Sequence, residues 1–306
     1  MIPIVCVMGP TAVGKSDLAV AAALRFGGEV VNADSMQVYR GIPIGTGAPA
    51  PRMLADVPHQ LFGYRDLREA PDAGEFAREA SAVISEIRSR GRIPVVVGGT
   101  FFWIRALFQG LSDIPEVPED VRRAVLEEIR VRGAAAAHER LRGVDSATGL
   151  RLKPGDTQRI ARALEVFDAT GVPLSRFQER AMRPAVSGRI LKLALSLPRS
   201  VLYGRIDARV DAMIAAGLVD EVRSVLASGL APDSRPMRTT GYAPVVAHVL
   251  GEIDLGEMRR RVAQGHRNYA KRQETWLRKE PGVETFDARE PEAALGRIAE
   301  FLEERD

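Results

Sequence analysis

The chain is constrained most by a short stretch near its start, which reads Gly9-Pro10-Thr11-Ala12-Val13-Gly14-Lys15-Ser16. The spacing is the G-x-x-x-x-G-K-[ST] pattern of a phosphate-binding loop. An apolar run, Ile2 to Met8, comes before it, and the helix-like residues 17–24 follow it. A strand, a glycine-containing loop and a helix in this order predict an α/β fold whose parallel sheet places the loop at the carboxyl end of a strand.

The chemistry of this stretch explains the residue types. Glycines 9 and 14 let the backbone bend so that successive N–H groups point into one concavity, and the helix that follows adds partial positive charge. Lys15 supplies a mobile cation for phosphate oxygens, and the Ser16 hydroxyl is placed to ligate Mg²⁺. The pattern leaves open which phosphate compound binds and whether phosphate is transferred or departs. The expected phosphate contacts are Gly9, Thr11, Ala12, Val13, Gly14, Lys15 and Ser16.

Length and composition bound the remaining possibilities. The 306 residues are 45% hydrophobic, which is enough for one large domain with an insertion or for two domains. The single cysteine, Cys6, lies in the first apolar strand, so a disulfide framework is excluded and a reducing cytoplasm is expected. The strand begins too early for a signal peptide, and no apolar run approaches the roughly 20 residues of a membrane span.

Two further strand ends carry polar residues. Glu29 to Ala33 is predicted to be a buried strand, and Asp34-Ser35-Met36-Gln37 follows it. Asp34 has two possible roles beside a phosphate site, holding Mg²⁺ through water or acting as a general base, and a plain turn or cap is the structural alternative. Another strand, Ile93 to Val97, runs into Gly98-Gly99-Thr100, where the threonine offers a hydroxyl to a ligand.

The intervening segments are less specific. Residues 41–70 are rich in Gly and Pro and are expected to form a long irregular segment over the site. Asp72 and Glu75 resemble a capping box that opens a helix. Phe101 to Trp103 are candidates for an apolar wall or for ordinary core positions. Met213 to Leu226 is expected to be an amphipathic helix, and Val283 to Phe286 a last short strand.

The hydrophobic pattern changes between residues 115 and 186, where helical periodicity occurs without a convincing strand. The strand pattern resumes at Ile190 to Ser196. We therefore predict a P-loop NTPase-like parallel-sheet core, residues 1–114 and 187–306, with an inserted all-helical domain at 115–186. A basic bias marks this insertion, although acidic residues are interspersed and each arginine alone is explained by a solvated helix face. Among the residues that give this bias are Arg122, Arg123, Arg159, Arg162, Arg176, Arg180 and Arg183.

Other basic residues gather in the second half of the chain. Arg205 and Arg209 are one helical turn apart and fit either closure over phosphates or surface ion pairs. The net charge of +3 has two explanations, a coding bias toward arginine and a nucleic-acid partner, and the clustering on a helix from Glu257 to Lys279 favours the polyanionic partner. The basic residues of that helix are Arg259, Arg260, Arg261, Arg267, Lys271, Arg272, Arg278 and Lys279.

Several of these motifs occur together in a known order. They are Gly9-Pro10-Thr11-Ala12-x-Gly-Lys-Ser16, Asp34-Ser35-x-Gln37-Val38-Tyr39, Gly98-Gly99-Thr100, Asp156-x-Gln158-Arg159-x-x-Arg162-Ala163-Leu164-Glu165-Val166 and Tyr269-Ala270-Lys271-Arg272-Gln273-x-Thr275-Trp276. The set resembles the bacterial tRNA dimethylallyltransferase family, also called tRNA isopentenyltransferase, from about residue 4 to residue 280. The resemblance implies transfer of a dimethylallyl group from dimethylallyl diphosphate to N6 of adenosine 37 in tRNAs of the A36-A37-A38 type.

The resemblance also implies roles for particular residues. Asp34 would be the general base, Thr100 would bond the departing oxygens, and Lys15 with Mg²⁺ at Ser16 would neutralise the diphosphate. Arg205 and Arg209 remain candidates to bind that diphosphate because of their spacing, not because of the resemblance. The helical insertion would clamp the anticodon stem of the tRNA, and a monomer is expected. The implied tRNA contacts are Asp34, Ser35, Met36, Gln37, Gln158, Arg159, Ile160, Ala161 and Arg162, with Arg122 or Arg123 assisting.

Two positions depart from the family pattern. Phe102-Trp103 replaces the usual Leu-Tyr pair, and Gly241-Tyr242-Ala243-Pro244 lacks the arginine of Gly-Tyr-Arg-Gln, for which Arg235 or Arg238 is a candidate substitute. Three other functions share parts of the pattern. A small-molecule kinase would turn over ATP, a prenyltransferase of free AMP or ADP would not need the basic insertion, and a non-catalytic RNA-binding switch would not need Asp34.

Overall fold

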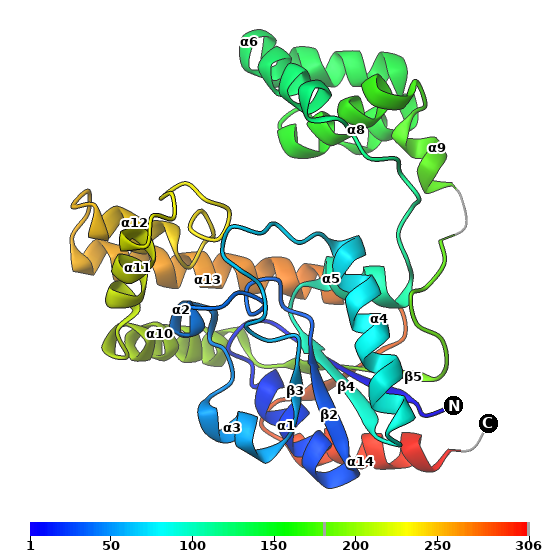
Figure 1. The fold of residues 1–306 in the computed structure, drawn as a ribbon, viewed down its shortest axis with the longest axis vertical. Coiled ribbons are helices and arrows are strands. Elements are labelled where there is room, and N and C mark those ends of the chain that lie inside the picture. The colour runs from blue at the N-terminus through cyan, green and yellow to red at the C-terminus, as the bar shows by residue number, and fades with distance from the viewer. Residues whose placement is uncertain (180–181, 305–306) are drawn as a thin grey trace. The chain divides into compact units, whose positions relative to one another are not determined.

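The computed structural model describes residues 1–179 and 182–304 (Figure 1). The chain divides into two compact units, one formed by Met1–Phe108 with Ala185–Asp306 and the other by Gln109–Pro184. The second unit overlaps the insertion predicted at 115–186. Arg180, one of the basic residues of that prediction, lies outside the described residues.

The first unit is built on a six-stranded sheet with strand order β3-β2-β4-β1-β5-β6, in which all neighbouring strands run parallel. The sheet confirms the predicted α/β fold class. Val5 of the central β1 pairs with Val95 of β4 and with Leu191 of β5. The strands are β1 Ile4–Met8, β2 Gly28–Asn32, β3 His59–Gln60, β4 Ile93–Gly98, β5 Ile190–Ser196 and β6 Val283–Asp287.

Both faces of the sheet are covered, which is why its central strands are apolar without alternation. Helices α1 (Lys15–Phe26) and α14 (Pro291–Glu303) pack on one face in a buried cluster that contains Val5 and Val7. Helix α4 (Ala73–Ser89) contacts β2 and β4, and its buried side chains lie outside that cluster, so it covers the other face. Burial raises the pKa of Cys6 to about 12, as expected for a structural thiol.

The other helices of this unit follow local signals. Asp72 caps α4 by accepting a hydrogen bond from the Glu75 amide at 2.8 Å, as predicted. The helix predicted from Met213 to Leu226 is wrong as a single element, because Gly217 (φ +99°) separates two helices. None of the described helices has the length and apolarity to cross a membrane. The helices are α2 Pro43–Thr46, α3 Pro51–Asp56, α5 Phe101–Phe108, α10 Arg199–Ala215, α11 Leu218–Ala227, α12 Ala243–Val249 and α13 Leu255–Leu277.

In the described residues of the second unit, all regular secondary structure is helical. It contains α6 Glu119–Val144, α7 Ser146–Arg151, α8 Thr157–Thr170 and α9 Leu174–Gln178. Leu141 of α6, Ile160 and Leu164 of α8 and Phe177 of α9 belong to one buried cluster. The periodic apolar residues of α6 and α8 thus close a core of their own, without a strand from the sheet.

Candidate active site

The phosphate-binding loop joins β1 to α1 and has an unusual backbone. Gly14 (φ +103°) is the N-cap of α1, and Ala12 occupies the left-handed region with φ +64°. That conformation costs a non-glycine residue about 1–2 kcal/mol, and such strain is characteristic of ligand-binding loops. A methyl group on Gly9 would lie 2.7 Å from Val13 Cγ1, so only glycine fits there. The loop therefore has the bent, amide-rich backbone expected of an anion-binding concavity.

A pocket of about 780 Å³ opens beside the loop. Lys15, Ser16, Arg205 and Arg209 line one part of it, which is basic. The rest is apolar and comes from the segment after β2 and from α10. The pocket thus combines cations with a hydrophobic wall, and its apolar lining residues include Pro43, Ile44, Pro49, Met53, Ala212 and Met213.

Two cations of this pocket, Lys15 and Arg209, have lowered pKa values. Burial lowers the pKa of Lys15 to about 8, against the opposing effect of the Asp34 carboxylate, and Arg209 lowers it further. Burial also lowers the pKa of Arg209, while Asp34 raises it. Throughout residues 1–179 and 182–304, no carboxylate forms an ion pair with Lys15 or Arg209. These charges are held ready for an anion rather than neutralised by the protein.

Arg205 and Arg209 both face the loop, although sequence spacing alone left a surface role open. Arg205 Nη1 donates to the main-chain oxygen of Val13 at 3.2 Å. Gly47 (φ +61°) packs directly on the guanidinium of Arg209, where any Cβ would overlap Nη2. Gly47 is a constraint that sequence reasoning missed, because the segment 41–70 carried no periodic signal.

Asp34 and Thr100 stand at neighbouring strand ends and share a hydrogen-bonded turn. The Thr100 hydroxyl accepts from the Ser35 amide at 3.0 Å and donates to Ser35 Oγ at 3.2 Å. Asp34 Oδ1 accepts from the Met36 amide at 2.9 Å. Its other carboxylate oxygen has no hydrogen-bond partner among the described residues, so it remains able to accept a proton from a ligand.

Gln273 of α13 connects the phosphate-binding loop to the Gly-Gly-Thr turn after β4. Its Oε1 accepts from the Thr11 amide at 2.8 Å, and its Nε2 donates to the main-chain oxygen of Gly99 at 2.9 Å. Tyr269 OH donates to the same oxygen at 3.1 Å. Gln273 is only 2% exposed. Tyr269 and Gln273 are four residues apart and share one face of α13, and a glutamine among apolar residues on such a face is a sequence signal of a buried polar role.

Gln37, a predicted tRNA contact, is already engaged within the protein. Its Nε2 donates to the main-chain oxygens of Thr46 and Gly47 at 3.1 and 2.9 Å. Through Gly47 it supports the position of Arg209. The amide nitrogen is therefore occupied, and the side-chain oxygen is the atom left for an RNA contact.

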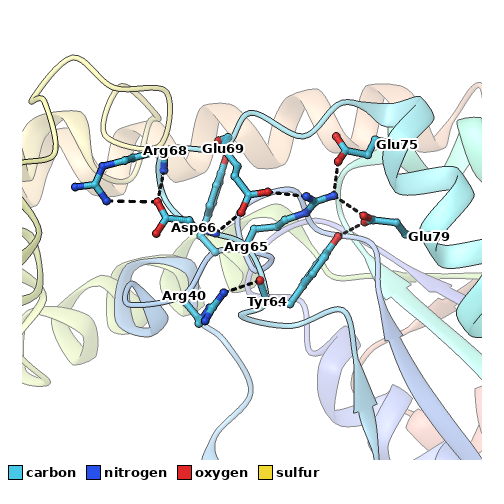
Figure 2. A network of polar contacts seen from close by, with 9 residues as sticks. Arg40, Tyr64, Arg65, Asp66, Arg68, Glu69, Glu75 and Glu79 are labelled. Atoms are coloured by element: carbon cyan, nitrogen blue, oxygen red, sulfur yellow. Dashed lines mark hydrogen bonds and ion pairs between the residues drawn. The ribbon is translucent and has the colours of Figure 1, made fainter.

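The residues after Asp34 are anchored from outside by a network around Arg65 (Figure 2). Arg65 pairs with Glu69 at 2.6 Å and also with Glu75 and Glu79 of α4. Its main-chain N–H donates to the Val38 oxygen at 2.9 Å. The network thus ties the turn that carries Asp34 to the helix that covers the sheet, which reduces its freedom before a substrate binds.

The aromatic residues after Thr100 divide between two environments. Phe101 and Trp103 are buried, and Trp103 stacks on Phe76 of α4 at 4.5 Å between ring centroids. The core interpretation is therefore confirmed for these two. Phe102 is 51% exposed. Phe102 differs from its neighbours because a helix starting at Phe101 turns adjacent side chains to different faces.

Within the helical unit, the predicted tRNA contacts on α8 differ in how deeply their side chains are buried. Gln158 and Arg159 are exposed, and Arg162 is partly exposed. Ile160 and Ala161 are 0% and 4% exposed and belong to the core, so side-chain contacts with tRNA from these two are excluded. Arg122 and Arg123 lie on the first turn and a half of α6, and Arg122 is 3.7 Å from Glu119.

The basic face of α13 is less charged than its sequence suggested. Arg259 forms two hydrogen bonds with Asp211 of α10 at 2.5 and 2.7 Å, and Arg267 pairs with Asp207 of the same helix at 2.5 Å. Arg260 and Arg261 share the Glu257 carboxylate. Much of the positive charge on this helix is therefore paired within the protein. Its remaining residues without a carboxylate partner in the described chain are Lys271, Arg272, Arg278 and Lys279.

The second departure from the family pattern, Gly241-Tyr242-Ala243-Pro244, lies at the start of α12. Tyr242 is 1% exposed and donates to Glu221 at 2.8 Å, so it is a packing residue. Ala243 and Pro244 begin α12. Arg235 and Arg238, the candidate substitutes for the missing arginine, are both exposed, and the charge of Arg235 acts on the nearby Tyr39.

A parallel sheet with this loop, a cationic pocket beside it and polar residues at the next strand ends define the class of P-loop α/β proteins. Comparison with known proteins narrows the class. Residues 37–280 match the family model described as IPP transferase. The chain belongs to the tRNA dimethylallyltransferase family, whose members are prenyltransferases that act on tRNA.

Individual relatives support this assignment along nearly the whole chain. A tRNA dimethylallyltransferase of Syntrophobacter fumaroxidans is 45% identical over 297 residues, 97% of this chain and 87% of the relative. One from Geobacter sulfurreducens is 47% identical, covering 92% of this chain and 90% of the relative. Among solved structures, a tRNA isopentenylpyrophosphate transferase of Bacillus halodurans aligns with a TM-score of 0.72 and 32% identity over 99% and 97% of the two chains.

A solved structure of a eukaryotic dimethylallyltransferase acting on tRNA also aligns. Its TM-score is 0.79 and its identity is 28%, covering 94% of this chain and 74% of that one. The expected family is confirmed by these matches.

Proposed function

We propose that this protein transfers a dimethylallyl group from dimethylallyl diphosphate to N6 of adenosine 37 in tRNAs of the A36-A37-A38 type and releases diphosphate. The observation that carries the proposal is that Asp34 lies close enough to Lys15 and Arg209 for its negative charge to raise the pKa of both. One carboxylate with an open oxygen acts on two cations that have no carboxylate partner of their own in the described chain. A proton acceptor thus stands beside a site suited to a departing anion.

The chemistry needs both groups. The adenine amine is a weak nucleophile because its lone pair is delocalised into the ring. As the bond from N6 to C1 of the prenyl group forms, the bond from C1 to the diphosphate oxygen breaks, and the N6 proton passes to Asp34. Charge accumulates on the diphosphate during this step. Lys15, Arg209 and the amides of the loop stabilise that charge most strongly in the transition state.

The Ser16 hydroxyl fits a role in holding Mg²⁺. It lines the pocket at the start of α1, beside Lys15. Mg²⁺ in phosphate sites takes few protein ligands and completes its shell with water and phosphate oxygens, so one hydroxyl is a sufficient donor set. When bound, the ion would supply further positive charge to the diphosphate.

The tRNA would be read by single-stranded contacts, since adenosine 37 must leave its stack to reach Asp34. Ser35, Met36 and Gln37 follow Asp34 directly in the chain, and Gln37 would contact RNA through its side-chain oxygen. Gln158, Arg159 and Arg162 of the helical unit, with Arg122 or Arg123, would contact the anticodon loop and stem. The protein is expected to act as a monomer. Thr100, whose hydroxyl is bonded to Ser35, would keep this turn in place and bond the departing oxygens when the ligand binds.

The proposal is tested by incubating the purified protein with Mg²⁺, dimethylallyl diphosphate and unmodified tRNA carrying A36-A37-A38. Mass spectrometry of the digested tRNA should reveal an added isopentenyl group on one adenosine. A matched tRNA with guanosine at position 37 should remain unmodified. Absence of the modified adenosine would refute the proposal.

Parallel reactions separate the other functions. Turnover of ATP would favour a small-molecule kinase, and prenylation of free AMP or ADP would favour the nucleotide-modifying activity. An Asp34→Ala variant that retains every function of the wild type would favour a non-catalytic switch.

A further inference from the structure

The helical unit contains a pocket of its own, of about 380 Å³. It lies between α7, α8 and α9, wholly within residues 148–178. Its lining combines three guanidinium groups, one amide, one hydroxyl and two leucines, and it includes no carboxylate. The lining residues are Thr148, Arg151, Leu152, Arg159, Arg162, Leu174 and Gln178.

The pocket is framed by buried polar contacts. Asp145 is 3% exposed and accepts from the amides of Thr148 at 3.0 Å and Ser175 at 2.9 Å, which joins the start of α7 to the start of α9. Burial alone would raise the pKa of Asp145, but these hydrogen bonds outweigh it and hold that pKa below its usual value. The carboxylate therefore stays charged and keeps the frame closed at neutral pH.

At the end of α7, His138 adds a second fixed point. Its Nε2 lies 3.0 Å from the main-chain oxygens of both Gly149 and Leu152. The last turn of α7, which carries Arg151, is thus held from inside the unit. The backbone on this side of the pocket is therefore held by part-buried contacts.

Arg151 is the most specifically oriented of the three arginines. Its Nη2 donates to Gln178 Oε1 at 2.8 Å and to Thr148 Oγ1 at 3.2 Å. Neither partner is charged, and no carboxylate in residues 1–179 or 182–304 pairs with Arg151. A guanidinium fixed in this way presents a planar, cationic surface whose charge is not neutralised.

The other two arginines have only loose carboxylate partners. Arg159 is 3.4 Å from Asp156, and Arg162 is 3.6 Å from Glu165. By contrast, Arg130 on α6 bonds Glu127 at 2.6 Å. The pocket therefore holds an excess of positive charge beside the apolar surfaces of Leu152 and Leu174.

We propose that this pocket binds one unstacked nucleotide of the tRNA loop, with its base against Arg151 and the leucines and its phosphate toward Arg159 and Arg162. Single-stranded RNA loops are recognised by bases that leave the stack and lie on aromatic or guanidinium planes. The volume is within the range of small-ligand pockets. The inference rests on the proposed function only in taking RNA as the substrate, and it adds a second nucleotide site distinct from that of adenosine 37.

The test is a double-mutant cycle between protein and RNA. Anticodon stem-loop RNAs are made in which each loop base except adenosine 37 is removed in turn, and binding is measured for the wild type and for Arg151→Gln. At one loop position, removing the base should weaken wild-type binding about 5- to 100-fold, the usual effect of losing a stacked base. The same removal should cost Arg151→Gln little further.

Two variants sharpen the experiment. Gln178→Leu removes the acceptor that orients Arg151, so it should give a smaller loss of coupling at the same loop position. Arg130→Gln is the matched control, because Arg130 is exposed on the same unit and lies outside the pocket. It should behave as the wild type at every position. Thermal melts of all variants establish that each is folded.

Two results would overturn the inference. If removing any loop base affects Arg151→Gln as much as the wild type, no base occupies the pocket. If inorganic phosphate competes for the pocket while every base-free RNA binds like its parent, the site holds phosphate alone. Prenylation of the intact stem-loop by the wild type is measured alongside, so failure of the proposed function is distinguished from failure of the second nucleotide site.

Discussion

The pocket beside the phosphate-binding loop and the basic face of α13 are both rich in cations, yet they differ in how those cations are paired. Lys15 and Arg209 have no carboxylate partner in the described chain, whereas Arg259 and Arg267 of α13 are bonded to Asp211 and Asp207 of α10. Charge in a sequence is therefore not the same as charge available to a ligand. A cation that the fold leaves unpaired, at the cost of its desolvation, indicates an anion site more strongly than a run of paired arginines.

If unpaired cations mark the active site, the largest loss of activity is expected from changing Asp34, whose carboxylate acts on Lys15 and Arg209. Asp34→Asn keeps an oxygen for the Met36 amide but cannot accept the N6 proton. Turnover should fall about 10²- to 10⁴-fold, the range for loss of a general base. Single-turnover kinetics with saturating tRNA measure it. A large loss of tRNA affinity with little change in rate would instead make Asp34 an RNA contact.

Gly47 tests whether the position of Arg209 matters. Gly47→Ala forces the guanidinium away from the pocket and should raise KM for dimethylallyl diphosphate about 10- to 100-fold, since small misplacements of a binding group have effects of this size. Gly41→Ala is the matched control, because Gly41 also has a positive φ (+83°) but its Cβ would meet no atom within 4 Å. Equal effects from both variants would attribute the loss to backbone strain alone.

Because the pKa of Lys15 is lowered, we expect activity to fall by about tenfold per pH unit above that pKa. Its pKa is lowered to about 8, so the free protein loses this cation as pH rises through that value. The ratio kcat/KM for dimethylallyl diphosphate, which reports groups in the free enzyme, should fall above about pH 8. In Lys15→Arg the side chain stays charged, so the profile should be flat over this range, even if its plateau is lower. An identical decline in the variant would assign it to another group.

The smallest effect is expected on α13. Arg259→Gln removes a cation that Asp211 already neutralises, so KM for tRNA and the slope of log affinity against log salt concentration should stay close to the wild-type values. A cation that contacts a phosphate would reduce that slope by about one. Lys271→Gln, at a position without a carboxylate partner, is the comparison variant. A reduced slope in Arg259→Gln would break the distinction between paired and unpaired cations.

Local patterns were sufficient for much of the fold. Apolar runs predicted the strands that carry Asp34 and Thr100, and the glycine spacing predicted the loop that carries Lys15. Parallel topology then required these residues to meet at one edge of the sheet. The break at Gly217 was not foreseen, because the end of a helix depends on what packs against it.

The candidate site could be predicted only in part from local sequence patterns. Its main residues follow strand ends, so their neighbourhood was predictable. The contacts of Gln37 with the turn at Gly47 were not, since the residues 41–70 lack any regular pattern. The pocket around Arg151 also escaped notice, because its lining comes from three helices and a lone arginine at a helix end has no distinguishing spacing.

The sequence by itself determined the phosphate-binding loop, the main strands of the sheet, and the strand ends on which polar residues stand. Each of these follows from hydrogen bonding and periodicity over a few residues. Only the tertiary structure decided which cations are free and which polar groups support them. Thr11 meets Gln273 across 262 positions of sequence, and Arg259 meets Asp211 across 48. Pairing at such separations depends on the packing of whole helices, which no local pattern encodes.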